Sequence, residues 1–330
     1  MSFSHREEKR DGRLLDILTD EQRGIRLIVS RLGAELVSLA RRGAATLLSQ
    51  GTTSEAGQQE CSPSDWVGFL HRDDDLSAPA QGWANHATVM GYYLHRLKDG
   101  RSTYRGRPIA GGTHSFLRTK QWRLTGSRTE NDRLSYVITR EDFTPTEYPL
   151  NVSLQLSYQF EGEGVRVVFR FENHETELTA HVGFGLHPGF AATNFDSFSF
   201  QMPAGHYRRH FSPDNYLSGE TEEIHFHGGE MPFSKEKLPG SYILELVDVP
   251  ERVFIFRDNP SGRSISIDLT GVPYLTLWSD GSPLLCVEPC WGLTDHDQQR
   301  AFENKEGIQT IAPRSVLQAS FSMTPRLDSR

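Results

Sequence analysis

The chain has few cysteines, no excess of basic residues and no long apolar run. Three of its 330 residues are cysteine, an odd number that argues against a framework of disulfides. Lys and Arg number 35 against 43 Asp and Glu, giving a net charge of −8. Proteins that bind nucleic acid usually carry a basic stripe, so the charge argues against that class.

No apolar stretch approaches the ~20 residues of a membrane helix. The charged residues of the first ten positions are not followed by the apolar segment of a signal peptide. We therefore expect a soluble, cytoplasmic protein that binds neither nucleic acid nor a membrane.

Cys286 and Cys290 lie four positions apart, with Val-Glu-Pro between them. A metal site would need two more ligands at a recognisable spacing, and none follows. We interpret both as small buried side chains near a strand end, and we predict no metal and no cofactor.

Alternation of apolar and polar residues with a period of two dominates the sequence, as expected for strands with one buried face. It runs through residues 151–160, turns at 161–164 and resumes over 165–171, which predicts a β-hairpin. The further predicted strands are residues 134–139, 242–247, 253–256 and 264–269.

Helical periodicity is weak, and residues 14–18 are its best candidate. We found no repeat and no linker, so residues 1–330 are predicted to form one all-β domain. Residues 1–20 are expected to be a loosely ordered extension, and residues 50–85 a long surface excursion near a site. The pattern fits a sandwich and a barrel equally well.

Three segments combine titratable groups with turn residues and aromatics. The first contains residues 91–96, then His114 and Arg118 beside Phe116 and Trp122. Polar donors next to aromatic faces suit a sugar, although a hairpin with surface basic residues has the same pattern.

The other two segments place His187 and Glu288 directly before a proline. Proline favours extended backbone in the residue that precedes it, as at a strand end opening into a cleft. Glu288 ends an apolar run, and buried carboxylates rarely lack a partner or a purpose. The two groups are a candidate acid–base pair, while a structural role is the commoner one for any single histidine.

Five motifs, in order, resemble those of the aldose 1-epimerase (galactose mutarotase-like) family. They are Gly33-Ala-Glu-Leu, the segment 91–96 ending in His95-Arg96, His114-Ser-Phe-Leu-Arg118 with Trp122, His187-Pro-Gly-Phe, and Cys286-Val-Glu-Pro-Cys-Trp-Gly. The resemblance implies a large antiparallel β-sandwich with few short helices and a sugar bound on a concave sheet face.

The resemblance also implies roles for individual residues. Glu288 would be the general base that takes the proton of the anomeric hydroxyl, and His187 the general acid that protonates the ring oxygen. His114 and Arg96 would hold ring hydroxyls or the ring oxygen, and Arg118 would assist them. The reaction needs no redox cofactor and no metal.

The chain departs from the family motifs at four positions. Ser115 replaces a glycine, His95 an asparagine, Gly189 a tyrosine and Cys290 a tryptophan. These changes leave the acid and the base in place but reshape the pocket, so the substrate stays open between an aldose and a modified aldose.

Two alternatives follow. A hexose-6-phosphate 1-epimerase would use the basic residues Arg96, Arg118, Lys120 and Arg123, which a solvated basic edge explains equally well. A non-catalytic carbohydrate-binding protein would keep the cleft and lose turnover. The expected partner is a small sugar or sugar phosphate, and the protein is expected to be a monomer or homodimer.

Overall fold

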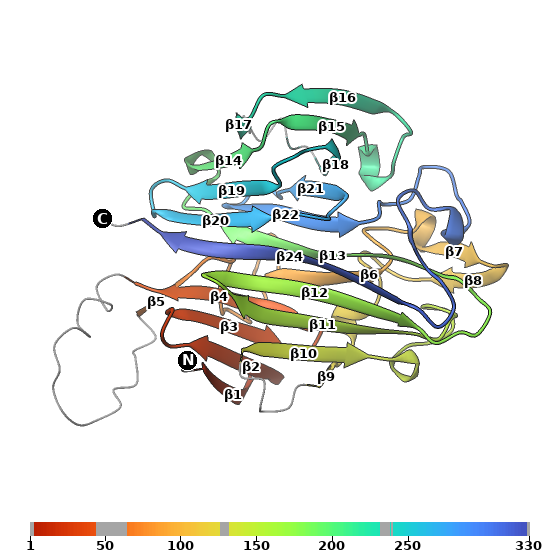
Figure 1. Ribbon diagram of the computed structural model, residues 1–330, viewed down its shortest axis with the longest axis horizontal. Helices are drawn as coiled ribbons and strands as arrows, with labels where there is room; N and C mark the ends of the chain where they lie inside the picture. Colours follow the sequence, from red (N-terminus) through yellow and green to blue (C-terminus); the bar gives the residue numbers. More distant parts are fainter. Residues whose placement is uncertain (1–2, 44–64, 126–131, 232–237, 239, 329–330) are drawn as a thin grey trace.

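The structure, a computed structural model, describes residues 3–43, 65–125, 132–231, 238 and 240–328. Within these ranges the named strands pair antiparallel, which confirms the predicted all-β class (Figure 1). The described helical segments are three-residue 3₁₀ turns: η2 (Lys98–Gly100), η3 (Leu117–Thr119), η4 (Arg140–Asp142), η5 (Phe195–Ser197), η6 (Pro213–Asn215) and η7 (Phe302–Asn304). No helix in the described ranges is long and apolar enough to cross a membrane.

The largest described sheet contains β9 (Arg123–Leu124), β10 (Arg133–Ile138), β11 (Val152–Glu161), β12 (Gly164–Asn173), β14 (Phe198–Met202), β17 (Gly229–Met231), β19 (Val253–Asp258), β20 (Arg263–Asp268) and β24 (Val316–Leu327). Their order is β17-β14-β19-β20-β24-β12-β11-β10-β9. The predicted hairpin is β11–β12, in which Leu156 lies opposite Phe169. Both strands alternate between buried and half-buried residues, as their sequence pattern indicated.

The second sheet contains β6 (Ala87–Tyr92), β13 (Ala180–Ala191), β15 (Gly205–His210), β16 (Thr221–Phe226), β18 (Tyr242–Asp248), β21 (Tyr274–Trp278), β22 (Leu284–Trp291) and β23 (Gln309–Ile311). Their order is β16-β15-β18-β21-β22-β13-β23, and β6 also pairs with β13. A separate ribbon joins β7 (Arg101–Tyr104) to β8 (Arg107–Ala110).

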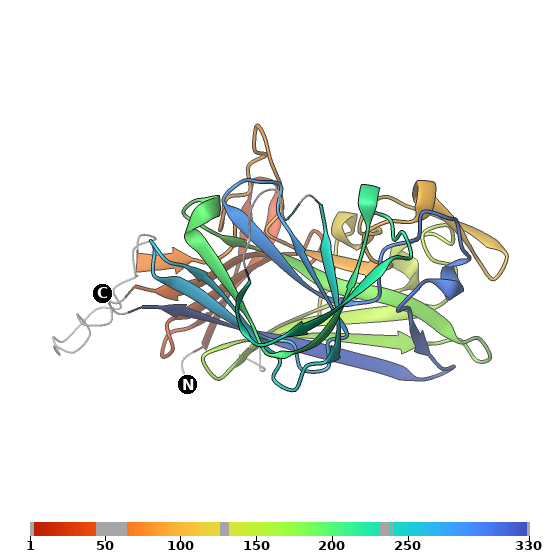
Figure 2. The same cartoon turned by 90° about the horizontal axis from the view of Figure 1, so that it is seen from above.

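The two large sheets pack face to face, as the resemblance implied (Figure 2). Trp291 of β22 stacks on Phe184 of β13 with ring centroids 5.0 Å apart, and Phe169 of β12 lies 5.2 Å from Phe184. Aromatic contacts of this kind add to the free energy gained by burying apolar area.

Strands β13 and β22 are buried on both faces, unlike β11 and β12. Because successive side chains of a strand point to opposite faces, Trp291 and Phe184 enter the core while Glu288 and His187 point the other way. The face of β13 and β22 that points away from the core therefore carries the polar side chains of His187 and Glu288.

The N-terminal residues form a third sheet instead of the loose extension predicted for residues 1–20. Its strands, in order, are β1 (Phe3–Arg10), β2 (Arg13–Asp20), β3 (Ile25–Ser30), β4 (Glu35–Arg42) and β5 (Trp66–Gly68). The helical interpretation of residues 14–18 is also wrong, because they lie in β2, where Leu15 and Ile17 are buried.

Asp16 of β2 ties this sheet to the rest of the molecule. Its fully buried carboxylate accepts hydrogen bonds from Arg31 (2.8 Å) and from the Tyr136 hydroxyl of β10 (2.9 Å), and His5 of β1 lies 3.0 Å away. Burial alone would raise the pKa of Asp16, but these hydrogen bonds hold it below its ordinary value.

We expect Asp16→Asn to lower the free energy of unfolding at pH 7 by about 2 kcal/mol, because hydrogen bonds to a charged group are lost. A lowered pKa stabilises the fold above the pKa of the unfolded chain, and this contribution disappears as the pH falls. Urea unfolding at pH 7 and at about pH 3 should therefore show the difference shrinking in acid. The exposed Asp11→Asn in the same hairpin is the control, and an equal loss at both pH values would contradict the assignment.

Candidate active site

A polar cleft of about 290 Å³ opens above β13 and β22. Its lining includes all five residues that the sequence singled out for a site: Arg96, His114, Arg118, His187 and Glu288. They come from segments almost 200 positions apart, and the fold brings them to one place.

Glu288 lies at the floor of the cleft between two imidazoles. Its side chain is 1% exposed. Oε2 lies 3.0 Å from Nε2 of His95, and Oε1 lies 3.2 Å from Nε2 of His187. A buried carboxylate requires donors of this kind, because its desolvation is otherwise very costly. Sequence reasoning treated His95 only as a departure from a motif and missed this contact.

Burial lowers the pKa of His187, and the neighbouring Glu288 opposes that effect only in part. Burial also lowers the pKa of His114 far below the ordinary value, and His187 and His95 add to the shift. Both imidazoles are therefore mainly uncharged at neutral pH. An imidazolium formed at His187 would be a stronger acid than a histidine in water.

A backbone hydrogen bond joins His95 and His114 directly. Both have positive φ values, 52° and 62°, and the His114 amide donates to the His95 carbonyl oxygen over 2.7 Å. Few residues other than glycine adopt this conformation, although histidine is among those that do so more often. The His114 ring lies edge-on to His187 with centroids 5.1 Å apart.

The aromatic walls of the cleft are Trp83 and Trp278, not the residues that the sequence suggested. Phe116 and Trp122 are buried in the core, and the Trp122 indole donates to the Leu117 carbonyl oxygen. Trp83 stacks on His187 with ring centroids 4.9 Å apart. No motif pointed to either tryptophan.

Trp83 belongs to the excursion predicted for residues 50–85, of which residues 50–64, including Cys61, lie outside the described ranges. The described part contains β5 and reaches the cleft through Trp83 and Asn85, as expected of a segment near a site. Gly189 makes room for it, because a Cβ atom there would lie 2.4 Å from the Trp83 ring.

Of the four basic residues considered as phosphate ligands, two line the cleft and two lie outside it. Lys120 forms an ion pair with Glu147, and Arg123 one with Asp142, and neither residue lines the cleft. Arg96 and Arg118 line the cleft and have no ion-pair partner among the residues that the structure describes.

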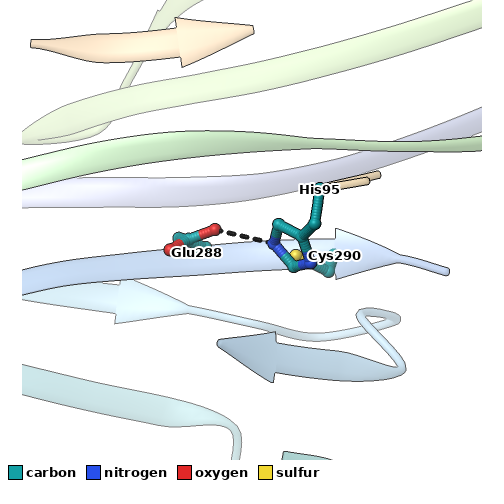
Figure 3. A group of neighbouring side chains, drawn as sticks. All are labelled: His95, Glu288 and Cys290. Carbon is teal, nitrogen blue, oxygen red and sulfur yellow. Dashed lines mark hydrogen bonds and ion pairs between the residues drawn. The ribbon is translucent and has the colours of Figure 1, made fainter. Parts of the chain in front are cut away.

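Figure 3 shows a third side chain next to Glu288 and His95. Cys290 follows Glu288 by two positions on β22 and points to the same face, and the ligand atoms of the three residues lie within 4.8 Å of one another. Both Cys286 and Cys290 are buried and free, as expected of small side chains near a strand end.

The fold is a β-sandwich, and the titratable side chains of His187 and Glu288 lie in a cleft on one face of its second sheet. The family model for aldose 1-epimerase matches residues 75–290, and the chain belongs to this family. The lactococcal protein LacX (chromosomal form, Lactococcus lactis subsp. lactis) is 22% identical over 267 residues, covering 75% of this chain and 87% of LacX.

Solved structures of similar proteins have the same fold. A galactose mutarotase related enzyme from Lactobacillus acidophilus aligns with a TM-score of 0.78 at 22% identity, over 94% of this chain and 97% of the other. A galactose mutarotase-like protein from Lactobacillus casei aligns with a TM-score of 0.75 at 17% identity, over 98% and 100%. The large antiparallel β-sandwich expected from the motifs is thereby confirmed.

We expect Gly189→Ala to destabilise the protein by about 1–3 kcal/mol, because the added methyl group displaces the Trp83 ring from His187. Gly112→Ala is the matched control, since a Cβ atom there meets nothing within 4 Å. Urea unfolding of both variants measures the difference. Equal stabilities would show that Trp83 does not depend on the glycine.

Proposed function

We propose that the protein is an aldose 1-epimerase that interconverts the α and β anomers of an aldose or a modified aldose. The observation that carries this proposal is the pair of His187 and Glu288, 3.2 Å apart and buried at the floor of a polar cleft. Membership of the aldose 1-epimerase family supports it.

The chemistry requires an acid and a base next to each other, because the anomeric hydroxyl and the ring oxygen are bonded to the same carbon. Glu288 takes the hydroxyl proton while His187, in its protonated form, gives a proton to the ring oxygen. The ring opens to the free aldehyde, which rotates about C1–C2 and closes to the other anomer with the two roles reversed. Each positioned group contributes about 10²–10⁴-fold to the rate.

His95 keeps the base in place during this exchange. A sugar must displace the contact between His187 and Glu288, but Oε2 of Glu288 remains bonded to His95. His114, Arg96 and Arg118 then face the sugar as hydrogen-bond partners of its hydroxyls and ring oxygen. Trp83 and Trp278 present apolar faces to its C–H groups, an arrangement that suits carbohydrates.

We expect Glu288→Gln to slow anomer exchange by at least about 100-fold, because the amide cannot accept the proton. Sugar affinity should change by less than about tenfold, or ~1.4 kcal/mol, since the shape of the side chain is kept. Exchange NMR on a panel of aldoses and aldose 6-phosphates measures the rate, with His187→Asn as the second variant. An unchanged rate in Glu288→Gln would refute the assignment of the base.

The same experiment separates the enzyme from a carbohydrate-binding protein without turnover. If the native protein binds a sugar of the panel and accelerates the exchange of none, the cleft serves recognition alone.

A hexose-6-phosphate 1-epimerase is the second candidate, favoured by Arg96 and Arg118. Two guanidinium groups without ion-pair partners in the described ranges outnumber the single carboxylate of the cleft, that of Glu288. Arginine binds phosphate through paired, charge-assisted hydrogen bonds. A phosphate on the sugar would add negative charge next to these two guanidinium groups.

If the substrate is phosphorylated, Arg118→Gln should lower the ratio of kcat/KM for the hexose 6-phosphate to that for the free hexose by roughly tenfold or more. Arg123→Gln makes the same charge change outside the cleft, where Arg123 pairs with Asp142, and should leave the ratio as it is. Equal ratios in the two variants would favour an unphosphorylated aldose.

A further inference from the structure

Three side chains with different metal-binding chemistry meet at the floor of the cleft. His95 offers Nε2, Glu288 a carboxylate oxygen and Cys290 its thiol sulfur, and these atoms lie within 4.8 Å of one another (Figure 3). All three residues are buried. Such a donor set favours borderline or soft divalent cations such as Zn²⁺ over Mg²⁺ or Ca²⁺, which prefer oxygen ligands.

His95 and Cys290 reach Glu288 from distant parts of the chain, since the two positions are 195 apart in the sequence. The fold places both beside Glu288, because β22 carries Cys290 and the segment after β6 carries His95. A nitrogen and a sulfur ligand thus lie next to the same carboxylate.

The distances are close to those of a metal site. Zinc binds nitrogen and oxygen at about 2.0–2.2 Å and sulfur at about 2.3 Å, so tetrahedral ligand atoms lie roughly 3–4 Å apart. His95 Nε2 and Glu288 Oε2 are already 3.0 Å apart. The three ligand atoms lie within 4.8 Å of one another, so they must approach each other somewhat further to close around one ion.

We propose that His95, Glu288 and Cys290 form a binding site for one thiophilic divalent cation, with Zn²⁺ as the representative ion. Bound as a thiolate, Cys290 adds a second negative charge to that of Glu288, and a divalent cation balances both in this buried place. The Thr276 hydroxyl, 3.9 Å from Sγ of Cys290, adds a polar neighbour to the sulfur. His95 and Glu288 line the cleft, so a fourth ligand, water or a sugar hydroxyl, can reach the ion.

Occupation of this site has a consequence that rests on the proposed function. A carboxylate that coordinates a cation is a weaker base, so Glu288 would accept the proton of the anomeric hydroxyl less readily. The metal-free protein is then the more active form, and a bound thiophilic cation inhibits it.

Cobalt(II) is the probe for the binding test, because its thiolate complexes absorb in the near ultraviolet. The protein carries Cys61→Ser, so that Cys286 and Cys290 alone supply thiols, and is first freed of metal by a chelator. We expect one Co²⁺ per chain with a thiolate absorption band. Cys290→Ser should abolish the band, and His95→Asn should weaken binding at least roughly tenfold, since even the loss of an outer partner of a metal ligand costs about 10–100-fold.

Cys286→Ser is the matched control, because Cys286 lies on the same strand and is equally buried but is outside the cluster. It should keep the band, and circular dichroism confirms the folding of each variant. Absence of the band in the parent protein, or a band that survives Cys290→Ser, would overturn the proposal and leave His95 as a positioning residue for Glu288.

The activity of the same proteins gives a separate readout. Zn²⁺ should slow anomer exchange in the parent protein and in Cys286→Ser more strongly than in His95→Asn, each compared with its own metal-free rate. If the metal-free parent shows no exchange, the proposed function fails while the cobalt band still decides the metal site. If exchange is present and Zn²⁺ does not affect it, the inhibitory role fails by itself.

Discussion

The burial of the Glu288 carboxylate is the constraint on which the site depends. An uncompensated charge at this depth would cost several kcal/mol, so the fold must supply donors at both oxygens. His187 of β13 and His95, after β6, supply them. Because β6, β13 and β22 pair in one sheet, the register of these strands and the contacts of the carboxylate support each other.

Strands β13 and β22 serve two purposes through the alternation of their side chains. One face contributes Phe184 and Trp291 to the core between the sheets, and the other contributes His187 and Glu288 to the cleft. A site on central strands of the sheet holds the His187 imidazole and the Glu288 carboxylate at a fixed separation. The walls come from connecting segments, such as the one that carries Trp83, where sequence changes reshape the pocket without disturbing the sheet.

The sequence predicted the antiparallel strands well where alternation was long, as in β11 and β12, because ten residues of strict alternation fit no other structure. It failed for β2, where a short apolar run around Leu15 and Leu18 fits the helical and the extended period alike. Pairing with β1 and β3 decides between them, and so does the contact of Asp16 with Tyr136 of a distant strand.

The sequence by itself determined the all-β class, the family resemblance and five of the polar residues that line the cleft, since each depends on local patterns and short motifs. The tertiary structure alone decided which aromatic side chains face the cleft, placing Trp83 and Trp278 there and Phe116 and Trp122 in the core. It also decided that His95 and Cys290 meet at Glu288. The reason is physical: the neighbours of a side chain across a sheet depend on strand order and register, which no local pattern specifies.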